Sequence, residues 1–191
     1  MDAGQHAKQE TGGLARLLVN MAIMVVFVAL ATILLRTVVF VPYEIPSGSM
    51  EQTIMTGDMV FSEKVSYYIR KPQAGDIVTF ADPEVQGRTL IKRVIATEGQ
   101  TVNLIDGVVY VDGQPQTEPY TQGKPSYPLY RPQENLVIKF PYTVPEGCVW
   151  VMGDNRTSSQ DSRWFGAIPV SSITGRAAMV YWPFNHIGLL S

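Results

Sequence analysis

An uninterrupted apolar segment near the N-terminus constrains this chain most. Leu17 to Leu35 reads LLVNMAIMVVFVALATILL, and Asn20 and Thr32 are its only polar members. As an α-helix these 19 residues would be about 28 Å long, close to the roughly 30 Å hydrocarbon core of a bilayer. A secretory signal peptide has a shorter apolar stretch followed by a small-residue cleavage site, and the following LLRTVVFVP offers no such site. The sequence therefore predicts an uncleaved anchor that crosses the bilayer once.

The charges beside this segment leave its orientation open. Two basic residues precede it, two acidic residues dilute them, and Arg36 follows at once. Because the orientation of a span follows an excess of basic residues on the cytoplasmic side, no direction is favoured. The predicted organisation is a short tail at 1–16, the anchor at 17–35 and an outer domain at 36–191.

Composition excludes several classes of function. The 191 residues suffice for one globular domain, and the 15 basic and 17 acidic residues give a net charge of -2, with no basic excess for a phosphate-binding face. The one cysteine, Cys148, cannot form an internal disulfide, and two histidines are too few for an ordinary zinc site. We therefore expect no nucleic-acid partner, no metal and no cofactor.

Beyond residue 38, short apolar runs broken by Gly, Pro and Asp predict an all-β domain of mostly antiparallel sheets, with no convincing amphipathic helix. The pairs Asp106-Gly107 and Asp112-Gly113 flank VVYV at hairpin spacing and predict a small meander. The runs that we interpret as strands are DIVTF, TLIKRVIA, QTVNLI, GVVYVDG, NLVIKF, CVWVMG and AAMVYW.

An irregular insertion is predicted at about 113–147. Seven of the 13 prolines lie between Pro115 and Pro145, together with four tyrosines, and such a composition is typical of a loop. We expect this loop to pack on its own side chains and not to form a ligand platform.

Histidine is a poor candidate for a catalytic base in this chain. His6 precedes the apolar segment, and His186 lies near the other end, where a lone histidine is more often solvated or structural. This placement disfavours a Ser-His-Asp triad. A hydrolase without a metal would then need another base beside its nucleophile.

Three other segments carry suitable groups. IPSGSM at 45–50 places a Ser-Gly-Ser after a rigid proline, so one hydroxyl could attack while a neighbouring hydroxyl or amide faces the oxyanion. Lys92 interrupts an aliphatic strand, and on a buried face desolvation would lower its pKa from about 10.4 and make it a usable base. The alternative is a lysine at a strand edge in water, with Arg93 on the opposite face. GDNRTSSQDSR at 153–163 borders a site or forms a salt-bridged surface loop.

Taken in order, these segments resemble the bacterial type I signal peptidases, which are membrane-anchored Ser/Lys endopeptidases that remove signal peptides from secreted preproteins. The resemblance runs from the anchor to the last residues and is closest to the compact Gram-positive type. Four ordered motifs are more specific than any single one. They are IPSGSM at 45–50, GDIVTF at 75–80, IKRV at 91–94 and MGDNR…DSR at 152–163.

The resemblance implies a role for each matching residue. Ser49 matches the nucleophile, Lys92 the general base, and Ser47 the residue whose hydroxyl joins the Ser49 N–H in the oxyanion hole. Ser159 matches the serine that orients the lysine. The residues that match the walls of the shallow pockets for the P1 and P3 side chains are Tyr43, Ile45, Ile54 and Ile91. The residues that match a supporting charge network are Arg93, Asp154, Asp161 and Arg163.

The same resemblance implies a single-pass plasma-membrane enzyme whose catalytic domain lies outside the cytoplasm. It would act as a monomer on preprotein signal peptides, cutting after small residues in an Ala-x-Ala-like pattern, at the lipid surface. Three alternatives stay open: a relative specialised for pilin or conjugation factors, a self-cleaving Ser/Lys protein of the phage-repressor type, and a catalytically silent membrane-anchored binding module. The bilayer span and the absence of a DNA-binding segment argue against the second.

Four residues depart from the family pattern. Gln52 stands where the family usually has proline, and Ala96, Glu98 and Gln100 replace a usual Gly, Pro and Asp. All four lie beside the predicted site without providing a predicted catalytic atom. They bear on the local backbone shape and not on the Ser/Lys pair.

Overall fold

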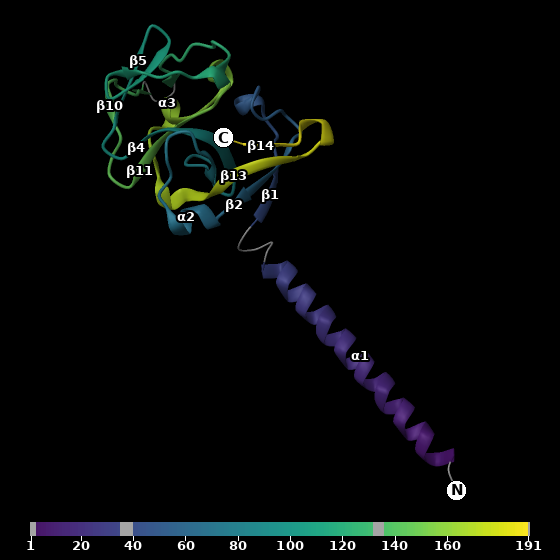
Figure 1. Ribbon diagram of the computed structural model, residues 1–191. Coiled ribbons are helices and arrows are strands. Elements are labelled where there is room, and N and C mark those ends of the chain that lie inside the picture. Colours follow the sequence, from purple (N-terminus) through teal and green to yellow (C-terminus); the bar gives the residue numbers. More distant parts are fainter. Residues whose placement is uncertain (1–2, 35–39, 132–135, 191) are drawn as a thin grey trace. The chain divides into compact units, whose positions relative to one another are not determined.

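The computed structural model describes residues 3–34, 40–131 and 136–190, and it divides into two compact units, Met1–Val39 and Phe40–Ser191. In the first unit, α1 (Ala3–Leu34) makes one helix of the predicted tail and anchor (Figure 1). Its stretch Gly13–Ile33 is long and apolar enough to cross a membrane, and none of it is buried. The predicted end of the anchor at Leu35 and the start of the outer domain lie outside the described residues.

The second unit confirms the all-β prediction. Its main antiparallel sheet has the strand order β1-β2-β13-β3-β4-β11-β12, and β14 pairs with β13. The strands of this sheet are β1 (Phe40–Glu44), β2 (Met59–Glu63), β3 (Ile77–Ala81), β4 (Thr89–Thr97), β11 (Cys148–Met152), β12 (Ile168–Pro169), β13 (Ile173–Trp182) and β14 (Gly188–Leu189). The short helices are η2 (Gly48–Met50), α2 (Val65–Ile69), η3 (Pro119–Thr121), η4 (Arg156–Ser158), α3 (Ser162–Phe165), η5 (Val170–Ser172) and η6 (Phe184–His186).

The long strand β13 curls this sheet. Its first residues pair with β3 and its later residues with β2, and the register shifts within both pairings. Gly175 makes the close approach possible, because a Cβ there would lie 2.5 Å from Ser62 Oγ and 2.8 Å from the Glu63 carbonyl oxygen. The turn η2, which follows β1, contacts β4 of this sheet, and the predicted catalytic residues lie at that contact.

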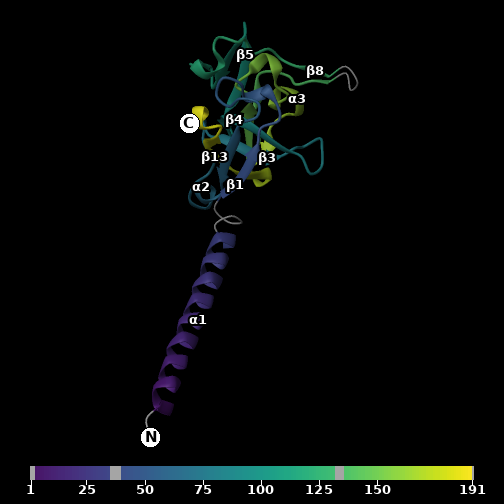
Figure 2. The ribbon, with the colours of Figure 1, turned by 90° about the vertical axis from the view of Figure 1, so that its right-hand side faces the viewer.

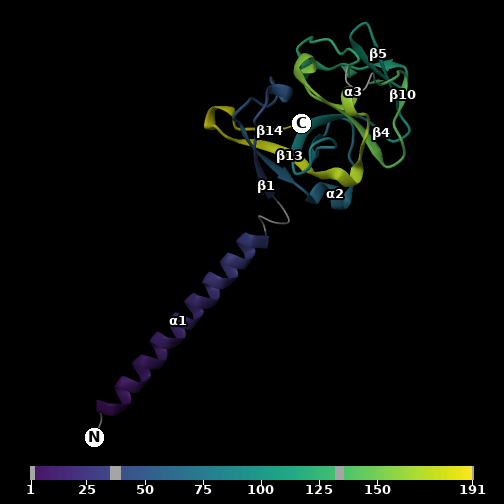
Figure 3. The ribbon, with the colours of Figure 1, turned by 180° about the vertical axis from the view of Figure 1, so that it is seen from behind.

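The predicted meander forms a second sheet with the order β10-β5-β6-β7. Asp106 and Gly107 have φ of 50° and 82°, and Asp112 and Gly113 have φ of 51° and 78°, so both two-residue turns have the left-handed backbone of tight hairpins. The three ribbon views place β5 at one end of the β domain and α2 at the other (Figure 1, Figure 2 and Figure 3). The strands are β5 (Thr101–Ile105), β6 (Val108–Val111), β7 (Gln114–Pro115) and β10 (Tyr142–Thr143), and a separate pair is β8 (Tyr130–Arg131) with β9 (Leu136–Val137).

Four strands of the main sheet were not predicted: β1, β2 and the two-residue strands β12 and β14. β1 contains Pro42, which interrupts the apolar run and is tolerated because β1 is the edge strand of the sheet. β2 is short and carries polar Ser62 and Glu63. The predicted strand NLVIKF contracts to β9, and part of that run lies outside the described residues.

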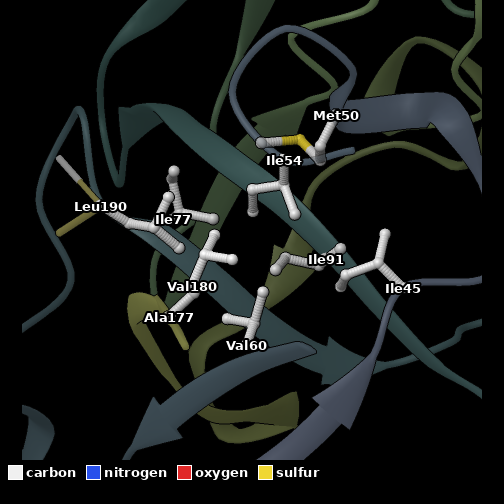
Figure 4. Close-up of a cluster of buried hydrophobic side chains, with 9 residues drawn as sticks. All are labelled: Ile45, Met50, Ile54, Val60, Ile77, Ile91, Ala177, Val180 and Leu190. Carbon is white, nitrogen blue, oxygen red and sulfur yellow. The ribbon is translucent and has the colours of Figure 1, made fainter. Parts of the chain in front are cut away.

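A buried hydrophobic cluster joins side chains of β2, β3, β4 and β13 to others from the segment 45–54 and from the residue after β14 (Figure 4). Two further clusters lie around Trp150 and around Phe80. The members of the first are Ile45, Met50, Ile54, Val60, Ile77, Ile91, Ala177, Val180 and Leu190. This cluster supports the turn that carries the predicted nucleophile.

Candidate active site

Ser49 lies in η2, a single turn directly after β1 and Pro46. The turn is fixed at both ends, because Ile45 and Met50 are buried in the cluster of Figure 4. Gly48 lies close to the Glu51 carboxylate, since a Cβ there would be 2.5 Å from Glu51 Oε1 and the flexible Glu51 side chain would have to shift. Ser49 is buried and Ser47 is exposed, so the predicted nucleophile faces the protein and the predicted oxyanion donor lies at the surface.

Lys92 reaches the same turn from β4. Its side chain is 3% exposed, and Nζ lies 2.6 Å from Ser49 Oγ and donates to the Ile91 carbonyl at 3.0 Å. β4 lies between β3 and β11, so Lys92 and Arg93 are both buried although they alternate in direction. The structure thus excludes the alternative of a lysine at a strand edge in water.

Burial lowers the pKa of Lys92 to about 8, although the charges of Asp161, Asp154 and Asp82 act in the opposite direction. An amine removed from water loses the hydration that stabilises its charged form. The neutral form can accept a proton, whereas an ammonium cannot. Above about pH 8, Lys92 is therefore a competent base held against a hydroxyl.

We expect the pH dependence of cleavage to report this group. kcat/KM should rise as Lys92 loses its proton and should level off above a midpoint near pH 8. The check is a pH profile on a peptide or preprotein substrate in detergent. A midpoint near 10.4, the value of a lysine in water, would contradict the assignment of the base.

Two buried ion pairs hold the loop 153–163 beside this pair. Arg93 donates from Nε and Nη2 to the two carboxylate oxygens of Asp154 at 2.9 and 2.8 Å. Arg163 donates from Nε and Nη2 to Asp161, both at 2.9 Å, and Asp161 also accepts the Gly153 N–H at 3.0 Å. The alternative of a salt-bridged surface loop is therefore wrong, because the charges neutralise one another inside the protein.

Asp161 stays ionised in this setting. Burial acts to raise the pKa of its carboxyl, but the Arg163 guanidinium and the Gly153 N–H outweigh burial and hold the pKa below its ordinary value. The negative charge is consequently present throughout the range in which Lys92 titrates. It limits how far burial can lower the pKa of Lys92.

Ser159 is buried beside Gly153, and its hydroxyl acts as a hydrogen-bond donor that helps to lower the pKa of the Asp161 carboxyl. A Cβ on Gly153 would collide with Ser159 Oγ and with the Ser49 carbonyl oxygen, so the three residues are in close contact. The hydrogen bond from Ser159 to Lys92 stays a prediction. Because residue 153 is a glycine, the turn that carries Ser49 (the nucleophile turn) and the loop 153–163 can lie in contact.

Three of the four predicted pocket residues lie together. Ile45, Ile54 and Ile91 belong to the cluster of Figure 4, and Ile91 is its most exposed member. Tyr43 is half-buried on β1, opposite Val60 of the same cluster. Only a thin apolar surface is therefore left for a substrate side chain.

His186 is a structural residue. Its Nδ1 lies 2.8 Å from Oδ1 of the buried Asp58, which also accepts the Met55 N–H at 2.8 Å. Among the described residues, no group of three or more His, Cys, Asp and Glu side chains could hold a metal ion.

The departures from the family pattern are accommodated locally. Gln52 has φ of 86°, a left-handed backbone that proline cannot adopt because its ring fixes φ near about -65°. Ala96 is buried beside Trp150 in the second cluster. Glu98 accepts from Lys71 at 2.8 Å, and Gln100 Oε1 accepts a backbone N–H at the end of β4 at 2.9 Å.

Sequence reasoning missed several residues that contact the site. Thr53 donates to Asp154 Oδ2 at 2.5 Å, and Asn155 contacts the nucleophile turn. The Pro/Tyr-rich insertion reaches the same loop through Glu118, Tyr120 and Lys124. Asn155 belongs to the motif at 152–163, so the sequence offered a signal for it. No local pattern in the sequence identifies the other four residues. The insertion contacts the loop 153–163 in addition to packing on its own side chains.

In this chain the Ser49 hydroxyl lies within hydrogen-bonding distance of the buried Lys92 amine, and two buried ion pairs lie beside them. A serine paired with a lysine in this way is the arrangement of the Ser/Lys class of hydrolases. Residues 18–182 match the family described as "Signal peptidase, peptidase S26", and the chain belongs to this family.

Relatives agree over most of the chain. A Synechocystis sp. protein named "Probable signal peptidase I-1" is 43% identical over 90% of this chain and 85% of its own length. The signal peptidase I of Bacillus licheniformis is 32% identical over 85% of this chain and 88% of its own length. A solved signal peptidase I of Enterococcus faecalis V583 is 34% identical, with a TM-score of 0.44, and the match covers 56% of this chain and 97% of that one.

Proposed function

We propose that this protein is a membrane-bound serine endopeptidase that removes N-terminal signal peptides from preproteins, with Ser49 as nucleophile and Lys92 as general base. The observation that carries the proposal is the 2.6 Å distance from the buried Lys92 Nζ to Ser49 Oγ. Membership in the signal peptidase family supports the substrate class.

The mechanism is acyl transfer. Neutral Lys92 takes the Ser49 proton while Oγ forms a bond to the scissile carbonyl carbon, and the Ser49 N–H and the Ser47 hydroxyl donate to the developing oxyanion. The tetrahedral intermediate collapses as the C–N bond breaks, and the leaving amine receives the proton from Lys92. Water then attacks the acyl carbon and gives one proton to Lys92. The bond from the acyl carbon to Ser49 Oγ breaks, Oγ takes that proton back from Lys92, and the carboxylic acid product is released.

The thin apolar surface over Ile45, Ile54 and Ile91 supports a preference for small P1 and P3 residues. The Met50, Val60 and Ile77 side chains behind it fill the space that a larger residue would need. The bound segment would lie extended beside a strand, so its backbone provides affinity while the pockets provide selection.

We expect a purified preprotein with Ala at P1 and P3 to be cut once, directly after P1. Replacement of the P1 Ala by Leu should lower kcat/KM about a hundredfold, because the larger side chain meets a packed floor. The measurement is mass spectrometry of the products, with quantified rates, in detergent micelles. Binding of the signal peptide without any cut would favour the silent binding module, and cleavage confined to pilin-type substrates would favour the specialised relative.

The enzyme is membrane-anchored, and α1 would supply its single span. We place the anchor in the plasma membrane, with the catalytic domain on the extracytoplasmic side and the protein monomeric. Tethering raises the local concentration of substrate where cleavage sites emerge from the lipid. Protease digestion of sealed vesicles tests the orientation: the β domain should be digested only from the extracytoplasmic side.

A further inference from the structure

The Pro/Tyr-rich insertion packs against the loop of the predicted charge network. Glu118 accepts two hydrogen bonds from the buried Arg156 guanidinium, both at 2.6 Å, and Ser126 Oγ accepts a third at 2.6 Å. The guanidinium carbon of Arg93 lies 4.1 Å from the centre of the Tyr120 ring. The segment around 118–126 is therefore held in a fixed position beside the active site.

Asn155 links this segment to the nucleophile turn. Its backbone N–H donates to the Ser49 carbonyl at 3.1 Å, and its Nδ2 donates to the Gly48 carbonyl at 2.8 Å and to Glu51 Oε2 at 3.3 Å. Its Oδ1 accepts from Lys124 Nζ at 2.7 Å, and the residue is 5% exposed. Every polar atom of this amide thus has a partner.

The partners allow one orientation of the Asn155 amide. A lysine ammonium can only donate, and a backbone carbonyl can only accept. The opposite orientation would set the amide NH2 against the ammonium and the amide oxygen against the Gly48 carbonyl. Lys124 therefore keeps the amide hydrogens directed at the nucleophile turn.

The Gly48 carbonyl and the Ser49 N–H belong to the same peptide group. Because this group is planar and rigid, fixing the direction of its carbonyl also fixes the direction of its N–H. That N–H is the backbone donor to the oxyanion in the proposed mechanism. If this N–H points away from the oxyanion, the transition state is stabilised less, while the bound substrate is affected little. The expected result is a lower kcat with a nearly unchanged KM.

We propose that Lys124 and Asn155 are positioning residues of the oxyanion hole, with Lys124 orienting the Asn155 amide so that it holds the Gly48–Ser49 peptide group in its donating direction. This inference rests on the proposed function. The insertion would then contribute to catalysis through the contact of Lys124 with Asn155, without touching the substrate.

The test is kinetic and uses the full chain in detergent. Lys124→Met should lower kcat about tenfold and leave KM within about twofold, because the ground-state substrate does not use the oxyanion donor. Lys124→Arg should restore most of kcat, since a guanidinium can donate to the same oxygen. The matched control is Lys139→Met, which removes an exposed lysine of the same insertion and should leave kcat unchanged.

A second variant separates positioning from general damage. Asn155→Ala should lower kcat at least as much as Lys124→Met does, and the double variant should be no slower than Asn155→Ala, because both act through one amide. Equal kcat for Lys124→Met and Lys139→Met, or effects that multiply in the double variant, would overturn the inference. If Asn155→Ala fails to fold, the three lysine variants decide by themselves. A parent protein that cuts no preprotein would refute the proposed function instead.

Discussion

Replacement of Ser49 by Ala is expected to reduce preprotein cleavage by about 10⁴-fold or more, with the fold intact. The Ser49 hydroxyl oxygen is the atom that attacks in the proposed mechanism, and it is the oxygen that lies 2.6 Å from Lys92 Nζ. The measurement is the single-turnover rate in detergent, with circular dichroism as the check on folding. His186→Ala is the control and should retain cleavage, because His186 contacts Asp58 and not the Ser/Lys pair. Cleavage by Ser49→Ala at a near-parental rate would end the assignment.

Lys92→Met should abolish cleavage to a similar extent and should stabilise the protein at neutral pH. The folded-state pKa of Lys92 lies at about 8, below the 10.5 of a free lysine, so between these values the unfolded chain binds more protons. Stability therefore rises with pH through this window. Burial of the Lys92 amine lowers the free energy of unfolding by roughly 3 kcal/mol below about pH 8. This destabilisation decreases as the pH rises and is absent above about pH 10.5.

The measurement is urea unfolding of the parent and of Lys92→Met at pH 7 and pH 10. The methionine variant should unfold at a higher urea concentration at pH 7, and the difference should shrink at pH 10. Equal stability of the two proteins at pH 7 would show that the Lys92 amine is not held in a desolvated site.

Gly153→Ala should also have a large effect, and we expect it to lower kcat/KM at least about a hundredfold. Its new methyl group would collide with the Ser49 carbonyl oxygen and with Ser159 Oγ, so the nucleophile turn or the loop 153–163 must move. A displacement of about 1 Å is enough to cost this much in rate. Because Ser49 Oγ moves with its turn, its contact with Lys92 is also disturbed.

Gly188→Ala provides the matched control. A Cβ at position 188 would meet only the His186 carbonyl oxygen, at 3.8 Å, which is an ordinary contact. It should keep the parental kcat/KM and melting temperature. Parental kinetics for Gly153→Ala would show that the two segments can separate without loss of the site.

Local patterns in the sequence were enough for much of the fold. The Asp-Gly pairs predicted both tight hairpins, because those residues tolerate a left-handed backbone at low cost. The aliphatic run around Lys92 predicted β4, but it left open whether the lysine side chain is buried or lies in water. β1 was not predicted from the sequence, because Pro42 argues against a strand. Proline is tolerated there because β1 is an edge strand, which only the structure shows.

The charged residues were harder to place from sequence. Arg156 and Arg163 look like surface residues because an isolated arginine stays in water, and they are buried only because Glu118 and Asp161 neutralise them. Asp161 is a near neighbour of Arg163, but Glu118 lies 38 residues before Arg156. No local pattern records a partner at that separation.

By itself the sequence determined the apolar helix, the β domain and the residue types that can carry Ser/Lys chemistry, because each of these follows from short-range pattern and side-chain chemistry. The tertiary structure alone decided that Lys92 is dry and 2.6 Å from Ser49, and that the insertion reaches Asn155. Both depend on how β13 curls the sheet and on which distant side chains then meet. Desolvation and hydrogen-bond geometry are properties of that three-dimensional neighbourhood, and they turn an ordinary lysine into a base.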